Sequence, residues 1–387
     1  MADYEMVVVG LGAFGSAAAY QAVARGVGSV AGFEQFEFGH DRGASADHTR
    51  IIRRSYHHPA YVGLADRAYR EWAAIEDLSG QQLVVRCGGL DFYPAGAEGT
   101  LQTYQAAMDS CGVGYELLEQ RDVSHRWPQF VLPAGTTTLF QEDGGLVAAN
   151  RATAAMRHLA IEGGANLRER TPVTSIVARG DEYLITTGSG QHRAGSLILA
   201  TDAWANHLLG QLDVHLNLEV RQEQVCYFPT SSPRTFTPDR VPVWIWNHDP
   251  GFYGLPDFEG TGLKIGQDVG GHVVDAESRT FVTDPDYAAR VESFLRSLIP
   301  SGWGEPVTVK TCLYTLTPDR EFVVDLVPGH SRAAIALGAA HGFKFAPAIG
   351  RALVDLVTGA DPAIDRELFA ASREILTMDN PPHNYLV

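Results

Sequence analysis

The hydrophobic pattern of the chain starts with a short apolar run at residues 6–9, which is typical of a buried strand. A turn with three glycines follows at residues 10–15, and the alanine-rich stretch after it predicts a helix that ends at about Arg25. A second apolar run at residues 30–34 predicts the next strand and ends in Glu34. This order of strand, turn, helix and strand predicts a β-α-β unit.

The turn has the spacing GxGxxG, in which each glycine has a separate role. Gly10 permits a tight turn, Gly12 lets a diphosphate approach the backbone, and Gly15 lets the helix pack on the strand. The N-terminus of the helix then presents free N–H groups and a partial positive charge to the phosphates. Glu34 lies 24 residues after Gly10, near the position from which an acid binds a ribose hydroxyl. These features together predict a dinucleotide site.

The glycine motif alone does not distinguish NAD from FAD. A polar, glycine-containing loop at residues 39–45 stands where a simple dehydrogenase normally enters another helix, and this loop favours FAD. Two arginines three residues apart, Arg50 and Arg53, follow the loop.

Periodicity and length predict further elements along the rest of the chain. Strands are expected at residues 83–93, 135–141, 164–177, 183–187, 194–200 and 333–337, and helices at 99–111, 150–162, 285–298 and 348–358. Four aromatic-rich strands, at 224–228, 241–247, 252–256 and 262–267, suit a sheet that forms the wall of a pocket. Because the chain has no internal repeat and no long linker, we expect two domains that interleave.

Composition narrows the class of protein. A chain of 387 residues is long enough for two domains. Its net charge of −16 disfavours nucleic acids and anionic membranes as partners, because both require a basic surface. No apolar run reaches the roughly 18 residues of a membrane span, and the first residues do not have the pattern of a cleavable leader. The four cysteines lack zinc-type spacing, so we expect a cytoplasmic protein with no disulfide and no metal site.

Five sequence blocks carry a resemblance to a known family. They are TRIIR at 49–53, FYG at 252–254, GLK at 262–264, CLYTLTPD at 312–319 and HGFKF at 341–345. Together with the glycine turn, they make the chain similar to the monomeric sarcosine oxidase and N-methyltryptophan oxidase family over nearly its whole length. This family lies within the D-amino-acid-oxidase-like flavoproteins, where fructosyl amino acid oxidases are relatives.

The resemblance implies an α/β fold with a Rossmann-like FAD-binding domain and an interleaved substrate domain built on an antiparallel or mixed sheet. We expect the FAD-binding domain at residues 1–86, 145–216 and 311–387, and the substrate domain at residues 87–144 and 217–310. The expected cofactor contacts are Gly10, Gly12, Ala13, Phe14, Gly15, Glu34, Gln35, Ser45, Thr49, Arg50, Val173, Cys312, Gly342, Phe343 and Lys344.

The resemblance also implies that Cys312 forms a thioether to the flavin 8α carbon, so the FAD would be covalent. Attachment prevents loss of the flavin and changes its potential, while the protein supplies orientation and field. The alternative for Cys312 is a buried structural thiol, which is common for cysteine.

Further site residues follow from the same resemblance. Lys264 is the expected site of the reaction with O₂, because a fixed cation stabilises the negative charge that develops there. Arg50 would balance the charge of the flavin, and Arg53 and Lys344 would bind the carboxylate of the substrate. Tyr253 and Tyr314 would form aromatic walls of the substrate site, although either could equally be plain core packing.

One position departs from the pattern of the family. The sarcosine and N-methyltryptophan members carry histidine four residues after the active-site lysine, whereas this chain carries Asp268, which we count among the catalytic candidates. A carboxylate there favours a cationic or hydroxyl-rich substrate group, as in fructosyl amino acid oxidases, which also carry an acid at this offset. Ala46 also replaces a histidine that sarcosine oxidases carry nearby.

We therefore expect an FAD-dependent oxidase that transfers hydride from a secondary amino acid to the flavin and reduces O₂ to H₂O₂. The imine product would hydrolyse to an amine and an aldehyde. The alternatives are a fructosyl amino acid oxidase and a flavin amine dehydrogenase that uses another acceptor. The expected partners are the amino acid and O₂, and the expected state is a monomer or a weak homodimer.

Overall fold

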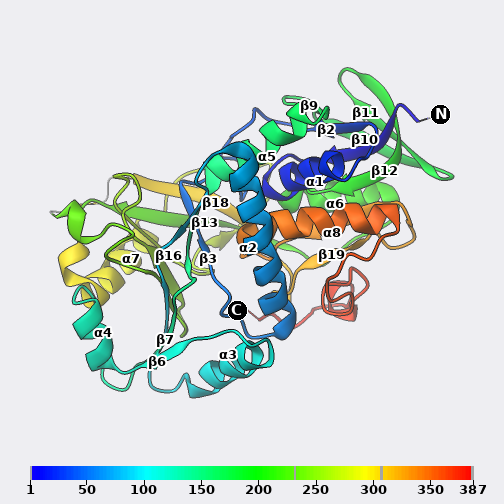
Figure 1. The fold of residues 1–387 in the computed structure, drawn as a ribbon. Helices are drawn as coiled ribbons and strands as arrows, with labels where there is room; N and C mark the ends of the chain where they lie inside the picture. The colour runs from blue at the N-terminus through cyan, green and yellow to red at the C-terminus, as the bar shows by residue number, and fades with distance from the viewer. Residues whose placement is uncertain (1, 231, 306–307, 385–387) are drawn as a thin grey trace.

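The computed structural model describes residues 2–230, 232–305 and 308–384. Two large sheets and one small sheet form its framework, and helices pack on them (Figure 1). The helices are α1 (Ala13–Ala24), α2 (Pro59–Ser79), α3 (Glu98–Ser110), α4 (Gln120–Arg126), α5 (Ala149–Glu162), α6 (Ala205–Leu209), α7 (Pro285–Leu298) and α8 (Ala346–Thr358).

The first large sheet contains the β-α-β unit that the sequence predicts. Its strands follow the order β10 (Val173–Arg179), β11 (Glu182–Thr187), β12 (Gly190–Leu199), β1 (Tyr4–Val9), β2 (Val30–Phe33) and β9 (Asn166–Arg168), while β20 (Ala333–Leu337) pairs with β12 and with β19 (Val323–Leu326). β1 is parallel to β2 and to β12, and β12 is parallel to β20. Helices α1, α5 and α8 pack together against this sheet, on the right of Figure 1.

The second large sheet carries the aromatic-rich strands. Its order is β17 (His272–Val273), β13 (Glu219–Phe228), β16 (Leu263–Gln267), β15 (Phe252–Leu255), β14 (Val243–Trp246), β5 (Gly89–Tyr93), β7 (Thr137–Gln141) and β6 (Glu116–Leu118), with β18 (Thr308–Leu316) alongside β13. All pairs are antiparallel except β14 with β5. This combination confirms the expected α/β fold with a mixed second sheet, and the domain boundaries stay a prediction.

A small sheet and a long helix lie between the two large sheets. The small sheet has the order β3 (Thr49–Ile52), β8 (Gly145–Ala148) and β4 (Val84–Arg86). Helix α2 has clear terminal signals that our sequence analysis did not use. His58 caps its first turn by accepting from the Ala60 N–H, Pro59 occupies the first helical position, and Gly80 ends it in the left-handed conformation.

Two expected strands need correction, and one observed strand was not predicted. The single strand expected at residues 83–93 is wrong, because β4 belongs to the small sheet and β5 to the second large sheet. Apolar residues stand on both sides of the break, so the pattern could not reveal the change of sheet. The strand expected at 164–177 is likewise two strands, β9 and β10. Strand β18, which carries Cys312, had not been predicted as a strand.

The cysteines at 87, 111, 226 and 312 are all free, and no disulfide joins them. Among the described residues, no helix combines the length and the apolar character that crossing a bilayer requires.

Candidate active site

The glycine turn between β1 and α1 has no room for side chains. Gly10 has φ +83°, and a Cβ atom there would lie 2.5 Å from the Ala200 carbonyl oxygen. A Cβ atom on Gly15 would lie 1.7 Å from the carbonyl oxygen of Gly10. The backbone of the turn therefore lies directly against the end of β12, and the first turn of α1 opens toward the adjacent cavity.

Glu34 fixes the other side of this turn. Its carboxylate accepts hydrogen bonds from the Leu11 N–H at 2.8 Å and from the Phe36 N–H at 3.1 Å. Burial alone would raise the pKa of Glu34, but His40 at 3.4 Å and the two amides outweigh burial and lower the pKa. The carboxylate is therefore charged at the edge of the cavity, where the ribose of a dinucleotide is expected.

One cavity of about 790 Å³ connects the glycine turn with the aromatic sheet. This volume is in the range of cofactor and ligand sites. Eighteen of the expected site residues line the cavity, namely Gly10, Gly12, Ala13, Phe14, Glu34, Gln35, Ser45, Arg50, Arg53, Val173, Tyr253, Lys264, Asp268, Cys312, Tyr314, Gly342, Phe343 and Lys344. Gly15 and Thr49 do not line it, because Gly15 packs beneath the turn and the Thr49 carbonyl faces Lys264.

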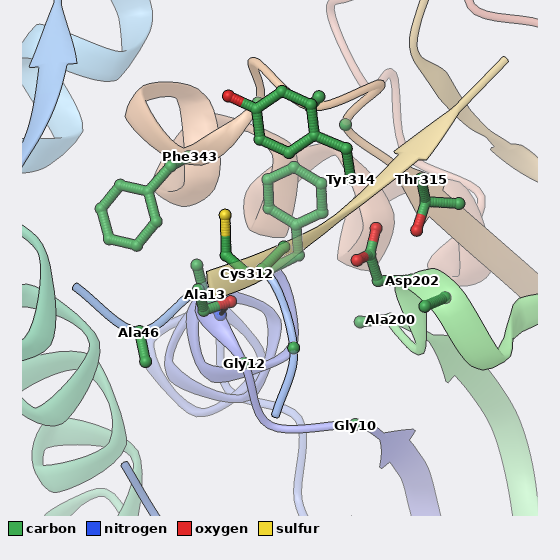
Figure 2. A pocket seen from close by; sticks show the side chains of 18 of the residues that line it. Gly10, Gly12, Ala13, Ala46, Ala200, Asp202, Cys312, Tyr314, Thr315 and Phe343 are labelled. Carbon is green, nitrogen blue, oxygen red and sulfur yellow. Dashed lines mark hydrogen bonds between the residues drawn. The ribbon is translucent and has the colours of Figure 1, made fainter. Parts of the chain in front are cut away.

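Buried polar side chains line the dinucleotide end of the cavity, namely those of Thr201, Asp202 and Thr315. Burial raises the pKa of Asp202 to about 6, and a hydrogen bond with Thr315 opposes this change. Figure 2 shows Asp202 and Thr315 on the side of the pocket beside Ala200, near the Gly10 turn. None of these three residues was predicted from the sequence. Buried polar groups next to the glycine turn fit a polar cofactor such as FAD.

Cys312 lies on β18, directly opposite Glu223 of β13. Its sulfur points into the pocket, on the side where Tyr314 and Phe343 stand (Figure 2). Burial raises the pKa of the Cys312 thiol to about 11, although the charge of Arg50 opposes this change. The thiol is thus accessible from the cavity but is protonated in these surroundings.

Lys264 lies on β16 and is 1% exposed. Its Nζ atom lies 2.5 Å from the Asp47 carboxylate and donates to the Thr49 carbonyl oxygen at 2.6 Å. Burial lowers the pKa of Lys264 to about 8, and Asp47 limits this decrease. Sequence reasoning missed Asp47, although it stands only three residues before Arg50.

Arg53 is buried and already has a carboxylate partner. Its Nη1 atom lies 2.9 Å from Asp91 Oδ1, and Ser55 donates to the other oxygen of Asp91 at 2.5 Å. The guanidinium also stacks over the ring of Tyr56, 4.6 Å from its centroid. The Nε atom of Arg53 is buried and has no hydrogen-bond partner among the described residues, while the residue as a whole lines the cavity.

Lys344 is also buried, but only neutral groups bind its ammonium. It donates to the Tyr56 hydroxyl at 2.8 Å and to the His341 carbonyl oxygen at 3.0 Å. Among the described residues, no carboxylate lies within ion-pair distance of Lys344. Burial lowers the pKa of Lys344 well below its ordinary value, and the nearby Arg53 lowers it further. An anion in the cavity would therefore relieve an uncompensated buried charge.

Asp268 also lines the cavity, and a cation that sequence reasoning missed lies beside it. Arg320 Nη2 is 3.3 Å from Asp268 Oδ2, and the Arg320 side chain is buried. The charge of Asp268 is therefore largely balanced within the protein, which weakens its role as a site for a cationic substrate group.

Comparisons with known proteins agree with this geometry. The family model described as FAD dependent oxidoreductase matches residues 5–356. The chain is 31% identical to a monomeric sarcosine oxidase from Bacillus sp. (strain NS-129), covering 96% of this chain and 97% of that protein. It is 29% identical to an N-methyl-L-tryptophan oxidase from Salmonella agona (strain SL483), covering 96% and 99%.

Among solved structures, the open form of NikD superposes with a TM-score of 0.84 at 28% identity, covering 99% of this chain and 98% of that chain. NikD is described as an unusual amino acid oxidase essential for nikkomycin biosynthesis. The match to the family model, together with 31% identity to a sarcosine oxidase over 96% of this chain, shows the family. This chain belongs to the FAD dependent oxidoreductases, and within them to the group of monomeric sarcosine oxidases and N-methyl-L-tryptophan oxidases.

Proposed function

We propose that this chain is an FAD-dependent oxidase of secondary, N-substituted amino acids, which forms H₂O₂ from O₂. The observation that carries the proposal is the single cavity that joins the glycine turn, the uncompensated cation Lys344 and the buried lysine Lys264. Bound FAD supplies the two-electron acceptor for the amine and delivers these electrons to O₂. The overall reaction converts the amino acid, O₂ and water into a primary amine, an aldehyde and H₂O₂.

The residues of the chain position and stabilise the reactants. Lys344 holds the substrate carboxylate by charge, and the guanidinium of Arg53, which also lines the cavity, gives it direction through hydrogen bonds. The rings of Tyr253 and Tyr314 form the wall beside Cys312 and exclude water from the reacting carbon. Lys264 stabilises the negative charge that develops on O₂ during its reduction.

Cys312 would bind the FAD through a thioether, because its sulfur faces the cavity. Glu34, the glycine turn and the buried polar side chains of Thr201, Asp202 and Thr315 would hold the dinucleotide part. The expected domain boundaries, the cytoplasmic location and the monomeric or weakly dimeric state remain predictions beside this proposal.

The fructosyl amino acid oxidase alternative is not favoured. It depends on Asp268 as an unpaired acid, and Arg320 lies beside this carboxylate. The likeness to fructosamine oxidase from Aspergillus fumigatus, at 20% identity with a TM-score of 0.79, shows the fold alone. Lys264 also argues against a dehydrogenase that avoids O₂.

An anaerobic screen tests the proposed function. N-methyl, N-fructosyl and cyclic imino acids are mixed with the holoenzyme, and the loss of flavin absorbance is followed. We expect bleaching by N-substituted amino acids, no bleaching by their methyl esters, and H₂O₂ on admission of air. Lys264→Met should slow reoxidation by about 10²–10³-fold while leaving flavin reduction unchanged. Rapid reoxidation of this variant would contradict the role of Lys264.

A further inference from the structure

Asp47 contacts both cations that line the wall of the cavity beside β3. Its carboxylate lies 2.5 Å from Lys264 Nζ and also forms an ion pair with Arg50. The hydroxyl of Tyr227 donates to the same carboxylate, and so does the His48 N–H at 2.8 Å. The Asp47 N–H in turn donates to Asn150 Oδ1 at 2.9 Å.

These contacts fix Asp47 on three sides. The backbone is held by α5 through Asn150, one carboxylate oxygen is held by Tyr227 of β13 and by the following amide, and the other oxygen pairs with Arg50 and Lys264. Asp47 is 5% exposed and does not line the cavity, whereas Arg50 and Lys264 do. It therefore stands behind the two cations and cannot itself touch a ligand in the cavity.

We propose that Asp47 is a positioning residue for Lys264: its carboxylate holds the ammonium charged and in place at the wall of the cavity. One carboxylate between two cations leaves a net charge of +1 at this wall. Without Asp47, the buried Lys264 and the half-buried Arg50 would be two neighbouring cations that share no counter-ion, and the lysine is the one that can lose its proton. This inference rests on the proposed role of Lys264 in the reaction with O₂.

The charged and titratable groups around Lys264 act in opposite directions. Burial lowers its pKa, Asp47 raises it, and Arg50 lowers it. Cys312 on β18 also faces Lys264, and Tyr253 on β15 and Tyr227 on β13 lie nearby; burial raises the pKa of each of these three groups, so all are neutral near pH 8. The exposed His48 imidazole packs edge-on against the Tyr227 ring, and Lys310 Nζ lies 5.4 Å from the centroid of that ring. Asp47 is therefore the anion that keeps Lys264 protonated.

The chain offers a direct measurement, because its only three lysines are Lys264, Lys310 and Lys344. Protein labelled with ¹³C and ¹⁵N at the lysine side chains should give three resolvable Cε–Nζ signals, assigned with Lys264→Met. The signals are titrated in the anaerobic holoenzyme after reduction with dithionite. The rate of reoxidation by O₂ is measured over the same pH range by stopped flow, which needs no amino acid substrate.

We expect the wild-type Lys264 signal to titrate near pH 8 and the reoxidation rate to fall with the same midpoint as the pH rises. Asp47→Asn should lower the pKa of Lys264 by about 1 to 3, since an opposite charge at this distance has that effect. A decrease from about 8 to about 6 would slow reoxidation at pH 8 by about fiftyfold, with recovery below pH 6. A structural role alone would not move the midpoint.

The matched control is Asp355→Asn. Asp355 is also a buried aspartate in an ion pair, with Arg25, but it lies on α8 and does not line the cavity. This variant should leave the pKa of Lys264 where it is. If Asp47→Asn does not fold, Tyr227→Phe tests the same contact: the carboxylate loses a donor and binds Lys264 more strongly, so the pKa of Lys264 should rise.

The outcomes separate the inference from the proposed function. The inference is overturned if the pKa of Lys264 is unchanged in Asp47→Asn. The same holds for Tyr227→Phe when that variant replaces Asp47→Asn in the test. In both cases the proposed role of Lys264 stands. Rapid reoxidation of Lys264→Met overturns both. A reoxidation midpoint that differs from the pKa of Lys264 in the wild type also overturns the inference.

Discussion

Alanine substitution in the glycine turn separates the two physical reasons why glycine stands there. Gly10 combines a left-handed conformation, φ +83°, with a Cβ position 2.5 Å from the Ala200 oxygen. Gly26, at the other end of the same helix region, has a nearly equal φ of +81° but open space around its Cβ position. Gly15 has only the steric problem, with the Gly10 oxygen at 1.7 Å. Gly10→Ala therefore combines an unfavourable backbone conformation with a steric overlap. Gly26→Ala has the unfavourable conformation alone, and Gly15→Ala has the overlap alone.

The expected magnitudes follow from these distances. The left-handed conformation costs an alanine about 1–2 kcal/mol, and an overpacked contact costs about 1–3 kcal/mol more. Gly10→Ala should therefore cost about 2–5 kcal/mol and Gly26→Ala about 1–2 kcal/mol. Gly15→Ala gains up to about 1 kcal/mol of helix propensity, which partly offsets its overlap. If the turn of the FAD-free variant opens to relieve the strain, FAD binding must restore the strained turn. The binding free energy then falls by at least about 2 kcal/mol, which corresponds to an increase of about 30-fold in Kd.

The assay uses a Cys312→Ser background, so that FAD binds reversibly if the thioether exists. Kd for FAD is measured by flavin fluorescence, and the melting temperature of the FAD-free protein is measured in parallel. Gly10→Ala and Gly15→Ala should weaken FAD binding strongly, whereas Gly26→Ala should lower the melting temperature slightly and leave Kd unchanged. Equal Kd values for Gly10→Ala and Gly26→Ala would refute the argument that the turn is the phosphate site.

Three further predictions concern substrate binding by Lys344 and attachment of the flavin to Cys312. Lys344→Met removes the uncompensated cation, so KM for the amino acid should rise about 30-fold or more, while reoxidation of dithionite-reduced enzyme should not change; an unaltered KM would contradict the carboxylate role. Because burial lowers the pKa of Lys344, its charge is lost as the pH rises through a value below the ordinary lysine range. KM expressed as the concentration of the neutral-amine form should therefore rise in mildly alkaline buffer, and this rise should be absent from Lys344→Met. Finally, acid precipitation of the wild type should leave the yellow colour with the protein, and the colour should stay in solution for Cys312→Ser; a colourless wild-type pellet would disprove the thioether.

Local signals in the sequence predicted the strand, the glycine turn and the helix correctly. The first strand, the turn, helix α1 and β2 follow one another within about 30 residues, so their pattern can be recognised from the local sequence alone. Glu34 lines the cavity, as expected from its distance to the turn, and Ser45, which the resemblance implied, lines it as well. The break of the expected strand at 83–93 was not predictable in this way, because pairing partners far along the chain decide which sheet each half joins.

Most of the balance of charge in the cavity could not be predicted, because the partners come from distant segments. Arg53 pairs with Asp91, Lys264 with Asp47, and Arg320 with Asp268. The pair of Arg50 with Asp47, three residues apart, is the local exception among these. The sequence shows these residues only as separate charges. The resemblance to the family therefore assigns Arg53 and Lys344 the same role, which is to bind the carboxylate of the substrate.

The structure makes the roles of Arg53 and Lys344 unequal. The charge of Arg53 is already balanced by Asp91, so we expect this guanidinium to offer a substrate hydrogen bonds and Lys344 to offer it net charge. An amino acid with a neutral secondary amine carries one negative charge, and this charge matches the positive charge of Lys344, which has no ion-pair partner among the described residues. We expect a zwitterion to bind less well, because its ammonium would lie in the same cavity as Lys344 and the cationic wall of Arg50 and Lys264. The arrangement therefore selects the neutral-amine form of the substrate, whose nitrogen lone pair is free to assist the oxidation of the adjacent carbon.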